Sequence, residues 1–374
     1  MKVVAARMHR VRQSLVHEFR TSSHQKSYLE HILIELHDQD GTVGWGEIAS
    51  PSGPFYCPET ADTCWTIAGE FLLPELINQD WEIPAAAAQT WAKVRGNPFA
   101  KAGVDMAVWA LWSQAQGISL AEALGGTRST VVAGVSLGIE PTIDDLLEQV
   151  HRHTEAGYPR VKLKIAPGWD VEPVRAVRES FGDLDLHVDA NGIYSTSDDH
   201  LAALTALDDF NLTMIEQPFA PRDLLAHAQL QTKINTPICL DESVETVDDL
   251  HTAVALNAIG VLNIKVSRMG GLTPAKQAHD VAQQNGIRVW CGGMHEFGIG
   301  RAANVALSSL PGFSLPSDVS ASAKYYARDV IIPEVIADQG VVTVPTGPGL
   351  GHRIDTDFIA EQTLQTVEIA AGRR

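Results

Sequence analysis

Short apolar segments that alternate with helical stretches are the feature of this sequence that most restricts its fold. Eight such segments recur at nearly constant spacing from residue 131 onward, each followed by residues with helical periodicity. Eight regular units without a glycine-rich dinucleotide-binding turn favour a parallel β/α barrel over a doubly wound open sheet. The expected strands are residues 131–139, 160–165, 184–191, 214–217, 238–242, 261–266, 289–292 and 313–317.

The first third of the chain has a different pattern, which predicts an α+β domain. A strand hairpin, a proline-rich loop and an Ala-, Leu- and Trp-rich helical region are expected over residues 28–37 with 42–48, 50–58 and 59–124. We therefore expect an α+β domain over residues 1–125 and a β/α barrel over residues 126–346. The tail, residues 347–374, is expected to pack on the N-terminal domain.

Ionisable residues interrupt five of the expected barrel strands, although a strand buried on both faces would be an unbroken apolar run. In RVKLKI and LDLHVDAN they alternate with apolar residues, so the ionisable set faces the barrel axis. They recur once per β/α unit, 25, 27, 25 and 24 residues apart, near the carboxyl ends of the strands, where barrel enzymes carry their chemistry. The series is Lys164, Asp189, Glu216, Asp241 and Lys265.

The charges of this series predict a metal-assisted enzyme. Burying unpaired charges is costly, so these residues must pair with one another or with a metal ion. Asp189, Glu216 and Asp241 on neighbouring strands suit a hard cation, Mg²⁺ first and Mn²⁺ second. Lys164 and Lys265 flank them and place a basic group on each face of a metal-held substrate. The pattern predicts abstraction of a proton next to a substrate carboxylate.

Other residues near the strand ends are expected to support the site or contact the substrate. Lys162 adds a second cation on the strand of the first catalytic lysine. Asn191 either joins the metal shell or only turns the chain, and Ser136 either contacts substrate or is a buried, satisfied hydroxyl. Gly293 and Met294 are expected to border the substrate, although Met294 fits the core equally well.

Three further features are compatible with either a role in the active site or a purely structural role. His187 faces the axis and is expected to be a packed, hydrogen-bonded histidine, not a base. Glu47 in GWGE is expected to be the polar end of a hairpin more than a site residue. The segments 21–25 and 53–56 are expected to be lids over the substrate.

Overall charge and targeting signals limit the partners. With 46 acidic and 28 basic residues the net charge is −18, which disfavours nucleic acid and anionic membranes. No signal peptide or membrane span is evident, and the four cysteines lack zinc-site spacing. We expect a cytoplasmic homo-oligomer that acts on a small carboxylate.

Several segments resemble a known family. KLK, VDAN, IEQP, LDES and NIKV match the muconate-lactonising subgroup of the enolase superfamily in type and order, and GVSLGI, KLKIAPGWD, RMGG and WCGGMHEFGIGRA are similar to its o-succinylbenzoate synthase/N-acylamino acid racemase family. The resemblance implies the enolase fold, a (β/α)₇β barrel under an α+β cap, and the metal-ligand and lysine roles given above. It implies dehydration of a cyclohexadiene precursor of menaquinone to o-succinylbenzoate, racemisation of N-succinylamino acids, or both.

Two features near the expected pocket bear on which reaction is catalysed. Arg268 matches an arginine of the racemising members, and its charge is expected to favour the neutral form of Lys265. His295 and Phe297 depart from the Leu and Ser of many relatives, and Phe297 is expected to narrow the pocket rim.

Other functions remain open on the sequence alone. A dipeptide epimerase or a muconate-type cycloisomerase would use the same site, but an epimerase needs an acidic motif on the last strand, where SLPSDVSAS offers only Asp318. A Schiff-base aldolase would need a nucleophilic lysine and no set of three carboxylates. A non-catalytic scaffold would not need a competent residue at every catalytic position.

Overall fold

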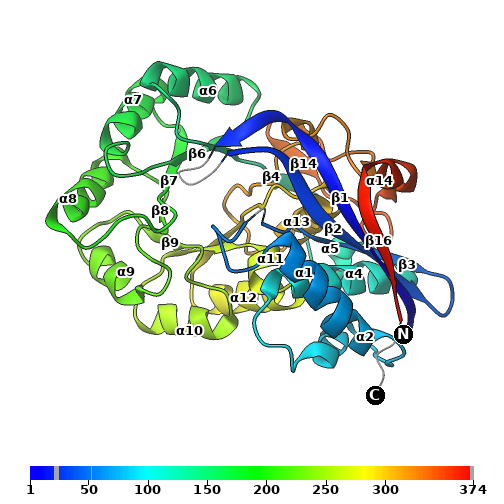
Figure 1. Ribbon diagram of the computed structural model, residues 1–374. Helices are drawn as coiled ribbons and strands as arrows, with labels where there is room; N and C mark the ends of the chain where they lie inside the picture. The colour runs from blue at the N-terminus through cyan, green and yellow to red at the C-terminus, as the bar shows by residue number, and fades with distance from the viewer. Residues whose placement is uncertain (21–24, 52, 371–374) are drawn as a thin grey trace.

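A computed structural model describes residues 1–20, 25–51 and 53–370. Seven parallel strands follow one another in the order β5-β6-β7-β8-β9-β10-β11, and the connecting helices lie outside them (Figure 1). The strands are β5 Val135–Leu137, β6 Arg160–Lys164, β7 Asp185–Asp189, β8 Ile215–Glu216, β9 Ile238–Leu240, β10 Val261–Ile264 and β11 Arg288–Cys291. The helices are α6 Ile143–Glu155, α7 Val171–Phe181, α8 Asp198–Ala206, η3 Leu207–Phe210, α9 Leu224–Gln231, α10 Val247–Ala255, α11 Val266–Met269, α12 Leu272–Gln284 and α13 Gly298–Ser308. The expected β/α barrel is confirmed.

The expected eighth strand, residues 313–317, is not a strand. Pro316 has no N–H to donate to a ladder, and only Ser317 forms an isolated parallel bridge. Ser317 N donates to Val132 O (2.9 Å), and Asp318 N donates to the carbonyl of the last residue of β11 (2.7 Å). These two residues therefore connect the last barrel strand to the segment that precedes the first.

The expected first strand, residues 131–139, is divided into two. β4 (Thr130–Val132) pairs outside the barrel with β14 (Val341–Thr343), and only β5 belongs to the barrel. The chain changes sheets at Gly134, where a Cβ atom would lie 2.2 Å from the guanidinium carbon of Arg160. Glycine is therefore required here because a buried arginine passes beside the backbone.

The capping domain is a four-stranded antiparallel sheet, in the order β16-β1-β2-β3, packed against helices. Its elements are β1 Val3–Arg20, β2 Gln25–Asp38, β3 Val43–Ile48, α1 Ala61–Ile67, η1 Ala68–Leu72, α2 Leu73–Leu76, α3 Pro84–Ala87, η2 Ala88–Trp91, α4 Pro98–Gln116, α5 Leu120–Leu124 and β16 Thr363–Ile369. The expected hairpin corresponds to β2 and β3. The long strand β1 was not expected from the sequence, and it pairs with β16 from the far end of the chain (Figure 1).

Glycines let α4 lie directly on β3. A Cβ at Gly46 would lie 2.1 Å from Gly103 O of α4, and one at Gly44 would lie 2.4 Å from Leu111 Cβ. The GWGE segment is therefore a close-packing surface on the capping domain. Apolar residues of β1, β2 and α4 form a second core beside the larger core of the barrel.

The remaining segments connect the two parts. They are η4 Ser322–Lys324, β12 Ile331–Ile332, β13 Ala337–Asp338, β15 Arg353–Ile354 and α14 Thr356–Gln362. Within residues 1–20, 25–51 and 53–370, no helix combines the length and apolar character needed to cross a membrane.

Candidate active site

Three carboxylates lie at the carboxyl ends of neighbouring barrel strands. Asp189 ends β7 and pairs in register with Glu216, which ends β8, while Asp241 directly follows β9. Their side chains are at most 1% exposed. The period-two pattern thus brings together the three carboxylates that the sequence selected.

The two lysines of the series approach these carboxylates from different strands. Lys164 ends β6, and its Nζ lies 2.6 Å from Asp189 Oδ2 and 2.6 Å from Asn191 Oδ1. Lys265 follows β10, and its Nζ lies 2.7 Å from Asp241 Oδ2. Because β6 and β10 lie on either side of β7, β8 and β9, the two ammonium groups flank the carboxylates.

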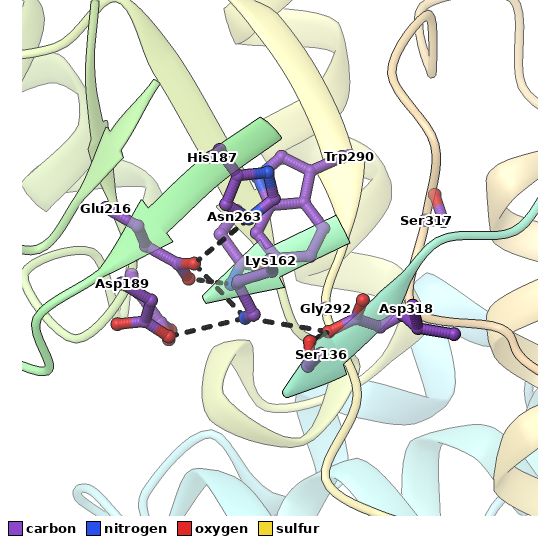
Figure 2. Close-up of polar contacts among 12 residues, drawn as sticks. Ser136, Lys162, His187, Asp189, Glu216, Asn263, Trp290, Gly292, Ser317 and Asp318 are labelled. Carbon is purple, nitrogen blue, oxygen red and sulfur yellow. Dashed lines mark hydrogen bonds and ion pairs between the residues drawn. The ribbon is translucent and has the colours of Figure 1, made fainter. Parts of the chain in front are cut away.

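A third lysine, Lys162, lies two residues before Lys164 on β6, and Figure 2 shows it between Asp189 and Glu216 on one side and Asp318 on the other. Lys162 Nζ is 3.1 Å from Glu216 Oε2 and 3.3 Å from Asp189 Oδ2. The other oxygen of Glu216 accepts a hydrogen bond from Asn263 Nδ2 at 2.7 Å. Burial opposes the charge of Lys162, but Glu216, Asp318 and Asp189 hold its pKa above the usual value.

Negative charge is concentrated on this set. Burial and the neighbouring Asp189 raise the pKa of Glu216 to about 8. Burial acts in the same direction on Asp189, but the ion pair with Lys164 lowers its pKa below the usual value. The carboxylates therefore repel one another, and a further cation among them would reduce that repulsion.

A hard divalent cation fits the donors of this set. Among the described residues, no three His, Cys, Asp or Glu side chains are grouped closely enough to form a finished metal site. Asp189, Glu216 and Asp241 are instead each bonded to basic side chains. Three buried carboxylates on adjacent strand ends are nevertheless the oxygen donors that Mg²⁺ and Mn²⁺ prefer.

Arg268 lies beside Asp241. Its guanidinium bonds the Asp241 carboxylate, and its Nε donates to Val244 O at 2.9 Å. Burial lowers the pKa of Lys265, but Asp241 outweighs that effect and holds it well above the usual value. Arg268 acts on Lys265 in the expected direction, lowering its pKa, yet it does not decide the result.

Tyr56 is a site residue that the sequence pattern did not single out. Its hydroxyl donates to Asp241 Oδ1 at 3.0 Å, and Lys265 Nζ donates to that hydroxyl at 3.3 Å. Tyr56 belongs to the segment 53–56 that was expected to be a lid. Its position in that loop is the sequence feature that could have indicated a role in the site. Residues 21–24 of the other expected lid lie outside the described part of the chain.

Several residues expected to contact substrate are bonded within the protein. Ser136 Oγ donates to Asp318 Oδ2 at 2.9 Å, and Met294 packs against the capping-domain core. Gly293 lies beside Asp318 and leaves little room for a Cβ atom. His187 is packed with its ring centroid 5.3 Å from that of Trp290, but the expected hydrogen bond is not formed, because neither ring nitrogen has a hydrogen-bond partner among the described residues. Substrate contacts of Ser136, Gly293 and Met294 stay predictions.

Phe297 lies in the core, not at the pocket rim where it was expected. It is fully buried, with its ring centroid 4.4 Å from that of His31 and 5.2 Å from that of Tyr326. It is buried because Glu47 of the capping domain accepts hydrogen bonds from Phe297 N (2.7 Å) and Gly300 N (2.8 Å). Glu47 thus caps α13 and ties the capping domain to the barrel.

A cavity of about 600 Å³ lies at the end of β1 and between α6 and the segment of η4, and Ser136 of β5 is among its lining residues. Lys324 and Arg152 bring positive charge to its lining and Glu140 brings a carboxyl group, whereas burial and Lys324 lower the pKa of His153 to about 4 and keep that ring neutral. Its lining residues are Leu15, His17, Ser136, Leu137, Gly138, Glu140, Gln149, Arg152, His153, Ala156, Tyr158, Ala321, Ala323, Lys324 and Tyr325.

Family models match nearly all of this architecture. Residues 3–125 match the N-terminal domain of the mandelate racemase/muconate lactonizing enzyme family, and residues 145–358 match the enolase C-terminal domain-like family. The chain belongs to this family of the enolase superfamily. The resemblance predicted from its sequence motifs is confirmed.

Relatives within the enolase superfamily extend over almost the whole chain. An o-succinylbenzoate synthase from Geobacillus kaustophilus is 46% identical over 89% of this chain and 88% of its own length. An N-succinylamino acid racemase from Amycolatopsis is 44% identical over 99% of this chain and 100% of its own length. The crystal structure of an enolase superfamily member from Listeria innocua is 37% identical, with a TM-score of 0.96 over 99% of each chain.

Proposed function

We propose that this chain is an o-succinylbenzoate synthase, an N-succinylamino acid racemase, or an enzyme with both activities. Both reactions begin with removal of a proton from the carbon next to a substrate carboxylate. The observation that carries the proposal is the placement of Lys164 and Lys265 on either side of three buried carboxylates. Relatives that carry each of these two names align with nearly the full chain.

The two lysines have different duties in the two reactions. In racemisation one lysine removes the proton from one face and the other delivers a proton to the opposite face. In a syn dehydration one base serves both steps, and the other lysine stabilises negative charge as an ammonium group. Asp189, Glu216 and Asp241 would hold Mg²⁺ or Mn²⁺, which supplies positive charge for the substrate carboxylate and for the charge that develops on proton removal.

The environment of Asp318 disfavours the dipeptide epimerase alternative. Its Oδ1 accepts from Arg160 Nη2 at 2.9 Å, and its Oδ2 accepts from Ser136 Oγ at 2.9 Å. Both carboxylate oxygens are therefore engaged inside the barrel and are poorly placed to receive a substrate ammonium group. A Schiff-base aldolase is disfavoured because its chemistry needs one nucleophilic lysine and no set of three carboxylates, whereas Asp189, Glu216 and Asp241 lie beside both lysines.

The cavity beside Ser136 suits the acyl part of such substrates. Lys324 Nζ lies 3.4 Å from Ser136 O and 5.4 Å from the centroid of the Tyr325 ring, so a cation and an aromatic surface border the same space. A succinyl group has an apolar stem and a terminal carboxylate, which would contact the Tyr325 ring and Lys324, with Glu140 on another part of the lining.

Parallel assays on the purified protein test the proposal. The protein is given the cyclohexadiene carboxylate, an N-succinylamino acid, a dipeptide and a muconate in the presence of Mg²⁺. Turnover of either of the first two supports the proposal. Turnover of the dipeptide or the muconate alone would place the chain in a neighbouring branch of the family.

A further inference from the structure

Asp318 lies where the barrel closes, on the side of Lys162 that faces away from Asp189 and Glu216 (Figure 2). Its Oδ2 is 3.6 Å from Lys162 Nζ. The Lys162 ammonium group is therefore surrounded by three carboxylates, only two of which belong to the candidate metal ligands. Trp290 lies on a further side, with its ring centroid 4.8 Å from Nζ.

Asp318 is held by groups that do not touch the candidate metal ligands. Arg160 bonds its Oδ1, and the same guanidinium donates to Pro316 O at 2.8 Å and to Val135 O at 3.2 Å. Arg160 is 1% exposed and lies over the Trp290 ring, 5.2 Å from the centroid. The position of the Asp318 carboxylate is thus fixed by the closure of the barrel, whatever binds at the strand ends.

This arrangement matters when a divalent cation shares the carboxylates. Asp189 and Glu216 would then face both the cation and Lys162, and two positive charges in a buried site repel each other strongly. Asp318 is the carboxylate near Lys162 that the cation does not need. Asp318 can neutralise the charge of the Lys162 ammonium group while Asp189 and Glu216 bind the metal ion.

We propose that Asp318 is a positioning residue that holds the Lys162 ammonium group as its counter-ion and so lets Asp189 and Glu216 bind metal and lysine together. This inference rests on the proposed metal-assisted function and extends it to a residue outside the lysine and metal-ligand series. Asp318 acts through Lys162 and does not touch the reacting atoms.

The central experiment is a calorimetric titration of the metal-free full-length protein with Mg²⁺, which needs no substrate. Asp318→Asn keeps the size of the side chain and an acceptor for Ser136, but it removes the charge. Lys162 is then balanced by Asp189 and Glu216 alone and competes with the cation. We expect the Kd for Mg²⁺ to rise about tenfold, equivalent to about 1.4 kcal/mol.

A double-mutant cycle separates this role from a general structural one. In a Lys162→Met background, Asp318→Asn should change the Kd for Mg²⁺ less than about twofold, because the competing ammonium group is gone. An equal loss of affinity with and without the Lys162 side chain would overturn the proposal. Asp105→Asn, which alters a buried carboxylate between α4 and α12, is the matched control and should leave the Kd unchanged.

A second variant covers the case in which Asp318→Asn does not fold. Ser136→Ala keeps the Asp318 charge but removes the hydroxyl that orients Oδ2, and it should raise the Kd in the same direction by a smaller factor. No change in the Kd with either variant refutes the inference alone. A parent protein that binds no Mg²⁺ in the titration refutes the proposed function as well.

Discussion

Lys164 and Lys265 each have a carboxylate partner of their own, so their contributions can be measured separately. Lys164→Ala is expected to lower both racemisation and dehydration by at least about 10²-fold, because it removes a proton-transfer group. Lys265→Arg should keep more dehydration than racemisation, since an arginine retains the charge but does not readily release a proton. Steady-state rates of both reactions test this expectation.

A surface lysine provides the control for these variants. Lys276 pairs with Asp280 on α12 and is 35% exposed, so Lys276→Ala should leave both rates unchanged. Equal activity of Lys164→Ala and the parent enzyme would refute the assignment of Lys164.

A substitution of Lys324 tests whether the acyl group of the substrate binds in the cavity. Lys324→Ala should raise KM for an N-succinylamino acid about tenfold and leave kcat nearly unchanged, because a charge that contacts the acyl end binds substrate and transition state alike. The same amino acid carrying an N-acetyl group has no terminal carboxylate and should show no change in KM. A similar change in KM for both substrates would argue against an acyl site at Lys324.

At the scale of whole elements, Asp105 joins the capping domain to the barrel. This buried residue of α4 accepts hydrogen bonds from Thr273 N (2.9 Å) and Thr273 Oγ1 (2.8 Å), and so caps the first turn of α12. Asp105→Asn should lower the free energy of unfolding by about 1–3 kcal/mol, because the amide cannot accept both bonds. Chemical denaturation of the two proteins measures this loss.

The same residue gives a pH dependence of known sign. Burial raises the pKa of Asp105 to about 6, above the ordinary aspartate value of 3.8. Between those values the folded state holds the proton and the unfolded state does not, so the contribution of Asp105 to stability falls as pH rises. The stability difference between the parent and Asp105→Asn should therefore be larger at about pH 5 than at about pH 7. A difference that grows with pH would contradict the raised pKa.

The elements that the sequence predicted well are those with a local signal. The strands β6 to β10 carry an ionisable residue at or just beyond a buried strand end, and alternation alone places Lys164, Asp189 and Glu216 correctly. The strand β1 gave no such signal because its apolar residues are interspersed with Arg and His, and its partner β16 is remote in sequence. Phe297 was misplaced because its burial depends on Glu47, 250 residues away.

The same reason explains why the roles of two residues, Tyr56 and Asp318, were not predicted. Tyr56 reaches Asp241 from the other domain, and Asp318 meets Arg160 only where the barrel closes. Neither contact follows from periodicity along one segment. The chemistry of the site was thus readable from strand patterns, whereas the residues that orient it depend on tertiary structure.

At the scale of the whole molecule, metal binding should couple to stability. A ligand that binds only the folded state stabilises it by about 2.7 kcal/mol at roughly 100 times its Kd. Adding Mg²⁺ to the metal-free protein should therefore raise its free energy of unfolding, and Asp241→Asn should remove most of that gain together with most of the activity. Denaturation with and without Mg²⁺ measures the effect.

Removal of the metal provides the complementary measurement. Treatment with EDTA should abolish turnover, and Mg²⁺ or Mn²⁺ should restore it. Full turnover in rigorously metal-free buffer would refute the proposed metal requirement, even if Mg²⁺ stabilises the protein against denaturation.

Because β1 pairs with β16, the capping sheet cannot be completed until late in the synthesis of the chain. At roughly 5–20 residues per second, Thr363 is added roughly 20–70 seconds after Val3. Throughout that time the outer edge of β1 has no partner strand, and an open edge of this kind invites pairing with other chains. The capping sheet is completed only as the last strand leaves the ribosome, so a nascent chain that stops before residue 363 should combine a nearly finished barrel with an aggregation-prone edge.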